Sequence, residues 1–118
     1  MSAEITVVGY PFQPTGMAEH ARSTFRAFQA AGLQPRLLDV ADANRGYDAD
    51  LERDFAPHLV STLGRGVNLF GVNGDEAARV IDKLGEAAFD AAYNIAYPAW
   101  ELARYPKAWA KVLDRFDE

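Results

Sequence analysis

Short apolar runs alternate with amphipathic stretches along this chain. Four of these runs are rich in β-branched and other apolar residues, which is typical of buried strands. The first run meets Gly9 and then a stretch with two prolines, so it predicts a strand that ends in a loop. The four predicted strands cover residues 5–8, 36–40, 67–72 and 89–97.

Between the predicted strands, apolar residues recur at three- and four-residue spacing, as expected of amphipathic helices. The first helix begins at Thr15 and stops at Gly32. The second begins at Asn73, which forms with Glu76 the residue pair of a helix cap. A third predicted helix begins at Pro106. The apolar positions that define the three helices are Met17, Ala21, Phe25 and Phe28; Ala77, Val80, Ile81 and Leu84; and Trp109, Val112, Leu113 and Phe116.

Residues 41–65 interrupt this regular order. They contain five acidic residues, and Pro57 lies inside a weak helical pattern formed by Phe55, Leu59 and Leu63. We interpret this segment as an irregular excursion with one short helix. Elsewhere, strands and helices alternate with short joints, which is typical of parallel crossovers. The sequence therefore predicts that residues 1–118 form one α/β, Rossmann-like domain of three layers, with a mainly parallel sheet of about four strands and an open edge.

Composition narrows the function classes. The 118 residues suffice for one domain, and a net charge of −5 without a basic run argues against nucleic acid as a partner. There is no cysteine, and the only histidines, His20 and His58, are too scattered to predict a metal site. No apolar run approaches the roughly 18 residues of a membrane span, and the start lacks a secretory signal. We expect a cytoplasmic protein without a transmembrane segment.

Ligands of open parallel sheets bind beyond the carboxyl ends of the strands. Three predicted loops meet there, at residues 9–16, 73–75 and 97–101. In the first, Gly16 opens a helix, where it is either an anion cradle or a glycine required by a tight turn. The loop matches neither GxGxxG nor the P-loop, so no dinucleotide or ATP cofactor is predicted. Asp39 is expected to cap its own loop.

The third loop concentrates aromatic groups beside a carboxylate. Trp100 and Glu101 follow Tyr97 closely, and such a group can stack on a sugar ring and bind its hydroxyls. The alternative is that Trp100 packs a carboxy-terminal helix onto the sheet, and for Trp109 packing is the favoured interpretation. We select Gly16, Asn73, Trp100 and Glu101 as substrate-binding candidates. No catalytic nucleophile or general base is assigned.

Two stretches resemble a known family. They are Asn-Leu-Phe-Gly-Val-Asn-Gly-Asp at residues 68–75 and the run from residue 93 through Trp100, Glu101 and Leu102 to residue 109. The chain resembles the N-terminal domain of bacterial glycosyltransferases of family 4, which have the GT-B fold. Residues 41–65 lie outside the resemblance, and Gly71 stands where relatives often carry a larger residue, commonly histidine.

The resemblance implies the acceptor-side half of a retaining enzyme that moves a sugar from a nucleotide-sugar donor to a saccharide or lipid-linked acceptor. It implies that Gly16 lies near the donor diphosphate, and that Trp100 and Glu101 lie beside the cleft between two domains. The donor-binding C-terminal domain of such enzymes has no counterpart in these residues, so we expect the chain to be inactive alone and to need that domain or a separate subunit.

Two other classes compete with this interpretation. The first is a non-catalytic binding module that kept the fold and self-associates into a homo-oligomer through an open sheet edge and apolar helix faces. The second is a flavodoxin-like or response-regulator-like domain. It fits less well, because the first strand ends in Gly9-Tyr10-Pro11 rather than in acidic residues, and because four strands are predicted instead of five.

Overall fold

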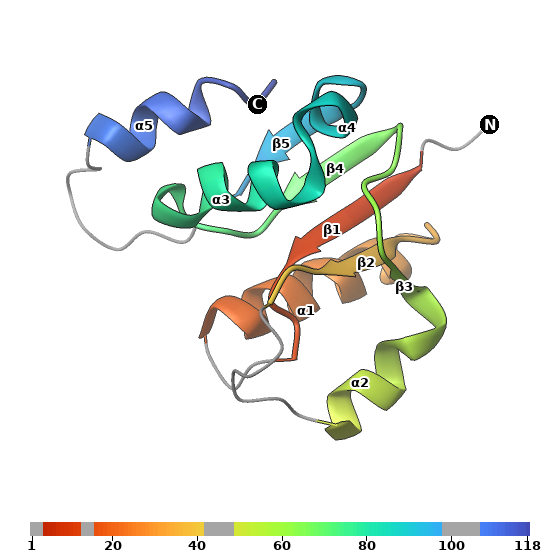
Figure 1. Ribbon diagram of the computed structural model, residues 1–118. Helices are drawn as coiled ribbons and strands as arrows, with labels where there is room; N and C mark the ends of the chain where they lie inside the picture. The colour runs from red at the N-terminus through yellow and green to blue at the C-terminus, as the bar shows by residue number, and fades with distance from the viewer. Residues whose placement is uncertain (1–3, 13–15, 42–48, 98–106) are drawn as a thin grey trace.

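A computed structural model describes residues 4–12, 16–41, 49–97 and 107–118 of the chain (Figure 1). The strands are β1 (Ile5–Gly9), β2 (Arg36–Asp39), β3 (Leu59–Val60), β4 (Val67–Phe70) and β5 (Tyr93–Ala96). The helices are α1 (Gly16–Ala30), α2 (Ala49–Phe55), α3 (Gly74–Leu84), α4 (Glu86–Asp90) and α5 (Lys107–Leu113), with a 3-10 turn, η1, at Ala56–His58.

The five strands form one sheet in the order β3-β2-β1-β4-β5. Every neighbouring pair is parallel. The chain adds strands on one side of β1 and then crosses to the other side, so the sheet has a topological switch point between β1 and β4. This order differs from the flavodoxin-like order 2-1-3-4-5. The predicted α/β, Rossmann-like fold with a parallel sheet is confirmed.

The two faces of the sheet carry separate cores, because side chains alternate along a strand. Figure 1 shows α1 and α2 on one face and α3, α4 and α5 on the other. The core beneath α1 and α2 contains Val7, Phe12, Ala21, Phe25, Leu37 and Phe55. The core beneath α3 and α4 contains Val8, Tyr10, Leu38, Val40, Phe70, Val72, Ala77, Val80, Ile81, Phe89 and Phe116. The layers are therefore the three that the sequence predicts.

The fourth predicted strand began too early. Phe89 lies in α4, and β5 starts at Tyr93. Gly85 separates α3 from α4 with φ of 100°, a conformation that side-chain-bearing residues rarely adopt. Phe89 is 1% exposed, and its ring centroid lies 5.7 Å from that of Phe70 and 5.1 Å from that of Phe116 in edge-to-face contacts. Phe89 therefore packs into the core from helix α4 and not from a strand.

The segment predicted as an irregular excursion contributes a fifth strand. Helix α2 ends at Phe55, and Pro57 falls in the 3-10 turn that follows. Leu59 and Val60 then pair with Leu37 and Leu38 of β2. The helical pattern predicted through Leu59 is wrong there, because Pro57 cannot donate the hydrogen bond that a continuing helix needs.

The edge of the sheet at β5 is partly occupied, whereas the sequence predicted it open. The amide of Ala96 donates to the carbonyl of Glu118 at 2.7 Å, and the amide of Asp117 donates to the carbonyl of Asn94 at 2.8 Å. Tyr93 of β5 and Tyr97, which directly follows β5, remain 44% and 49% exposed. In the part of the chain that the structure describes, no helix has the length and apolar character needed to span a membrane.

Candidate functional site

The carboxyl ends of β1 and β4 approach each other closely at the switch point. The amide of Gly71 donates to the carbonyl of Val8 at 2.8 Å. A Cβ added to Gly9 would lie 3.3 Å from the Cβ of Ala21 and 3.5 Å from the carbonyl oxygen of Gly71. A side chain at Gly9 would therefore be crowded between the two strand ends and α1. Ligands of this architecture bind at this end of the sheet.

Two of the four predicted binding residues lie at this end of the sheet. Gly16 is the first residue of α1, which follows β1, and Asn73 immediately precedes α3, which follows β4. Trp100 and Glu101 lie outside the described residues, as does the side chain of Trp109. The structure thus brings two helix starts, those of Gly16 and Asn73, to neighbouring strands on either side of the switch point.

Asn73 occupies the predicted cap position of α3 but does not cap with its side chain. Its backbone is extended, with φ of −81° and ψ of 162°, and its carbonyl accepts from the amides of Glu76 and Ala77, both at 3.0 Å. The side-chain Oδ1 is buried and has no hydrogen-bond partner among the described residues, and the same holds for Oε2 of Glu76. The predicted capping pair is therefore wrong as a side-chain interaction, and two acceptor atoms are left unused beside the switch point.

Tyr10 connects the loop after β1 to α3. Its side chain is buried, and Nη2 of Arg79 donates to its hydroxyl at 3.4 Å. Burial, together with the hydrogen bond to Glu76 and the negative charge of that residue, raises the pKa of Tyr10 to about 12. The phenol therefore keeps its proton at physiological pH and holds the first loop against the start of α3.

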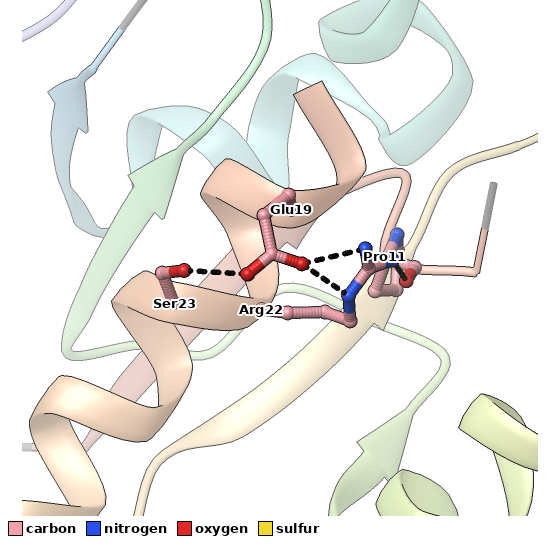
Figure 2. Close-up of polar contacts among 4 residues, drawn as sticks. All are labelled: Pro11, Glu19, Arg22 and Ser23. Atoms are coloured by element: carbon pink, nitrogen blue, oxygen red, sulfur yellow. Dashed lines mark hydrogen bonds and ion pairs between the residues drawn. The ribbon is translucent and has the colours of Figure 1, made fainter. Parts of the chain in front are cut away.

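Figure 2 shows how Arg22 holds the loop between β1 and α1. The residue is only 8% exposed, and its Nη1 donates to the carbonyl of Pro11 at 2.6 Å. Its Nε and Nη2 donate to Oε2 of Glu19 at 3.2 and 2.8 Å, and the hydroxyl of Ser23 donates to Oε1 at 3.1 Å. The hydrogen bonds from Arg22 and Ser23 lower the pKa of Glu19. One buried guanidinium thus joins the loop to the helix.

Sequence reasoning did not select Arg22 as a site residue, although a signal for it exists. Ala18, Ala21 and Phe25 are buried, so Arg22 lies within the apolar stripe of α1, where a charged residue needs a specific partner. His20 was also missed. Its Nε2 lies 3.3 Å from the carbonyl oxygen of Tyr97, and the two ring centroids are 4.4 Å apart. That contact joins residues far apart in the chain, so no local pattern indicates it.

Asp39 has the structural role that the sequence predicted. Its Oδ1 accepts from the amide of Ala41 at 2.9 Å, which caps the turn after β2. Across residues 4–12, 16–41, 49–97 and 107–118, no three histidine, aspartate or glutamate side chains are grouped closely enough to hold a metal ion. The site as described consists of backbone loops, hydrogen-bond acceptors and aromatic rings, which are suited to recognition of a polar ligand.

These features define an α/β, Rossmann-like domain whose parallel sheet has a topological switch point between β1 and β4. No protein-family model matches the chain, and no significant match is found among curated proteins or solved structures.

Proposed function

We propose that this chain is the acceptor-side domain of a retaining glycosyltransferase with the GT-B fold, similar to family 4. In the complete enzyme, a sugar would pass from a nucleotide-sugar donor to a saccharide or lipid-linked acceptor. The proposal includes a cytoplasmic location, as the sequence predicts. The observation that carries it is the switch point itself, where the starts of α1 and α3 and the loop held by Arg22 surround the ends of β1 and β4.

The acceptor atoms at this end of the sheet support a polyol as ligand. Oδ1 of Asn73 and Oε2 of Glu76 are buried and have no partner among the described residues, and each can accept a hydrogen bond from a sugar hydroxyl. Gly16 opens the neighbouring helix, so its backbone amide is placed where a bound phosphate oxygen would be favoured. Asn73 and Gly16 are thus proposed as binding residues, together with Trp100 and Glu101.

We expect this chain to bind ligand without catalysing sugar transfer. Departure of a nucleoside diphosphate needs positive charge at the leaving group inside a dry cleft. Here the buried cation Arg22 is engaged by Pro11 and Glu19, and Arg79 contacts Tyr10. A second domain, in the same chain or in a separate subunit, would supply that charge. We therefore propose that the 118 residues bind ligand but do not transfer sugar by themselves.

The test is a pair of measurements on the purified chain. Titration calorimetry with a panel of saccharide acceptors and of uridine and guanosine diphosphate sugars measures binding, and release of nucleoside diphosphate when both are present measures turnover. The expected result is binding without release. Clear transfer by the chain alone would contradict its proposed role as an incomplete half. Lack of binding to every nucleotide sugar and every saccharide would refute the glycosyltransferase proposal.

A self-associating module is the second candidate, and one observation favours it. Tyr93 begins the edge strand β5 and Tyr97 directly follows it, and the two are 44% and 49% exposed. Exposed aromatic rings on an edge strand are a common basis for contact between copies. Sedimentation velocity over a hundred-fold range of concentration distinguishes the two candidates. A dimer that dissociates when both tyrosines are replaced by serine would favour this second function.

A further inference from the structure

His20, Gly71 and Tyr97 form a group that joins α1 to the carboxyl ends of β4 and β5. His20 lies near the start of α1, Gly71 directly follows β4, and Tyr97 directly follows β5. Nε2 of His20 lies 3.3 Å from the carbonyl oxygen of Tyr97, and the two rings are in contact at 4.4 Å between centroids with a tilt of 49°. Three adjacent elements therefore meet beyond the carboxyl ends of β4 and β5.

The contact with Tyr97 determines which nitrogen of His20 carries the proton. A carbonyl oxygen only accepts hydrogen bonds, so Nε2 must be the donor in this pair. In the neutral imidazole, Nδ1 is then an acceptor. No described residue donates a hydrogen bond to Nδ1. The ring is therefore oriented by one nitrogen and presents an acceptor on the other.

Gly71 has no side chain, and the imidazole of His20 packs beside its backbone. A Cβ added at Gly71 would lie 3.7 Å from Cδ2 of His20 and 3.7 Å from the carbonyl oxygen of Val8. These are ordinary contact distances, so the imidazole packs directly over the position that a side chain at Gly71 would take. A long side chain there would compete with the ring of His20 for the same space.

The exposed ring of Tyr97 adds an apolar surface beside this acceptor. The residue is 49% exposed, although part of its ring packs against His20. A sugar ring complements both groups, because its C–H face stacks on an aromatic ring and its hydroxyls donate hydrogen bonds. A phosphate fits poorly, since the lone pair of Nδ1 would face the lone pairs of an anion.

We propose that His20 and Tyr97 form a subsite for one sugar ring. Tyr97 supplies the stacking surface, and Nδ1 of His20 accepts a hydrogen bond from a ring hydroxyl. The inference rests on the proposed function in one respect, since it takes a saccharide as the class of ligand. It goes further by assigning His20, which neither the motifs nor the helix starts indicate, and by pairing it with the ring of Tyr97 from the third loop.

The chain holds two histidines, which makes the test direct. The ring carbon-proton signals of both are recorded by NMR on the full chain, and the His58→Asn variant assigns them. His58 is a matched control, because it contacts Phe25 and Gln29 beneath the opposite end of α1. The probes are D-glucose, D-galactose and D-mannose, with inorganic phosphate as the anion control.

With at least one sugar, the His20 signals should shift while the His58 signals stay. His20→Ala and Tyr97→Leu should each weaken binding of that sugar roughly ten-fold, the usual effect of losing one hydrogen bond or one stacking contact. His58→Asn should bind as the wild type does. Backbone amide spectra establish that each variant is folded.

Three results would overturn the subsite. They are sugar binding that leaves the His20 signals in place, unchanged affinity in both His20→Ala and Tyr97→Leu, and a phosphate-induced shift of His20 as large as the sugar-induced one. Each of these leaves the proposed function standing if nucleotide sugars still bind. Absence of binding to sugars and to nucleotide sugars alike would overturn both the subsite and the proposed function.

Discussion

Asn68 donates a hydrogen bond to Asn94 across two neighbouring strands, with Nδ2 of the first 3.2 Å from Oδ1 of the second. The two residues face each other in register in β4 and β5 and are 0% and 2% exposed. Asn68 also exchanges two hydrogen bonds with the backbone of Gly64, at 3.1 and 3.0 Å, and Nδ2 of Asn94 donates to the carbonyl of Phe89 at 2.6 Å. The pair therefore joins the sheet to the turn before β4 and to α4.

Replacing Asn68 by alanine should lower the free energy of unfolding by about 2 to 4 kcal/mol, because the amide and carbonyl of Gly64 and Oδ1 of Asn94 would remain buried without partners. Urea unfolding followed by circular dichroism measures the change. Gln34→Ala removes the same amide group from an exposed position and should change stability by less than about 0.5 kcal/mol.

The double variant of Asn68 and Asn94 tests whether the two side chains act together. Because they share a hydrogen bond, their effects should not add, and the coupling energy should be about 0.5 to 3 kcal/mol. Strictly additive losses would contradict the direct contact and would leave each residue with only its backbone partners.

Much of this fold follows from periodicity, and the exceptions have physical causes. Four strands and the helices around Phe25 and Ile81 were predicted, because their apolar residues repeat over several turns or over a whole strand. Strand β3 was missed because Leu59 and Val60 alone are too short to show alternation. Phe89 was misassigned because an apolar residue before a strand has the same appearance whether it is extended or in one helical turn.

The binding candidates that the structure describes, Gly16 and Asn73, were chosen from local signals and remain predictions as binding residues. Gly16 and Asn73 were chosen because helix starts carry residue preferences that a sequence displays. Arg22 and His20 were not chosen, because their partners are the carbonyls of Pro11 and Tyr97, and backbone atoms leave no trace in the residue pattern. The stripe position of Arg22 on α1 is the one clue that could have been used.

The loop between β1 and α1 should loosen when Arg22 is replaced by methionine. This variant keeps the aliphatic stem but leaves the carbonyl of Pro11 buried without its donor, so we expect a loss of about 1.5 to 3 kcal/mol. Hydrogen exchange should accelerate at the amides of Tyr10 and Phe12. Arg22→Lys should recover only part of the loss, because an ammonium group cannot reproduce the planar fork that reaches both Pro11 and Glu19.

Arg65→Met is the matched control for this change, since Arg65 is exposed. Its stability and its exchange rates in the loop should equal those of the wild type. If Arg22→Met also left the loop amides as protected as before, the guanidinium would not be what holds the loop.

Because the pKa of Tyr10 is raised by folding, the domain should become less stable at alkaline pH. The pKa of the phenol is 10.0 in the unfolded chain and about 12 in the folded protein, so between these values the folded state retains a proton that the unfolded state has lost. The free energy of unfolding therefore falls as the pH rises through this window, by about 2 to 3 kcal/mol in total. Below pH 10 this contribution is fully present.

The measurement is urea unfolding from pH 9 to pH 12 for the wild type and for Tyr10→Phe. The variant has no phenol to titrate at this position, so its stability should fall less steeply across the window. Tyr97→Phe removes a hydroxyl from a half-exposed ring and serves as the control for loss of a tyrosine. Parallel curves for Tyr10→Phe and the wild type would show that Tyr10 is not the group responsible.

Gly66 should be the least tolerant of the glycines beside the sheet. A Cβ at this position would lie 2.4 Å from the carbonyl oxygen and 3.0 Å from the amide nitrogen of Glu4, so Gly66→Ala must push the start of β1 away from β4. Such overpacking typically costs about 1 to 3 kcal/mol, and here the obstructing atoms belong to a backbone that also receives the amide of Val67 at 2.7 Å. Gly71→Ala is the matched comparison, because its nearest contacts at 3.7 Å require no displacement. Thermal unfolding of the two variants side by side should give a clearly lower melting temperature for Gly66→Ala alone. Equal melting temperatures would mean that the first strand can shift without loss of pairing, which would contradict the tight approach of Glu4 to Gly66.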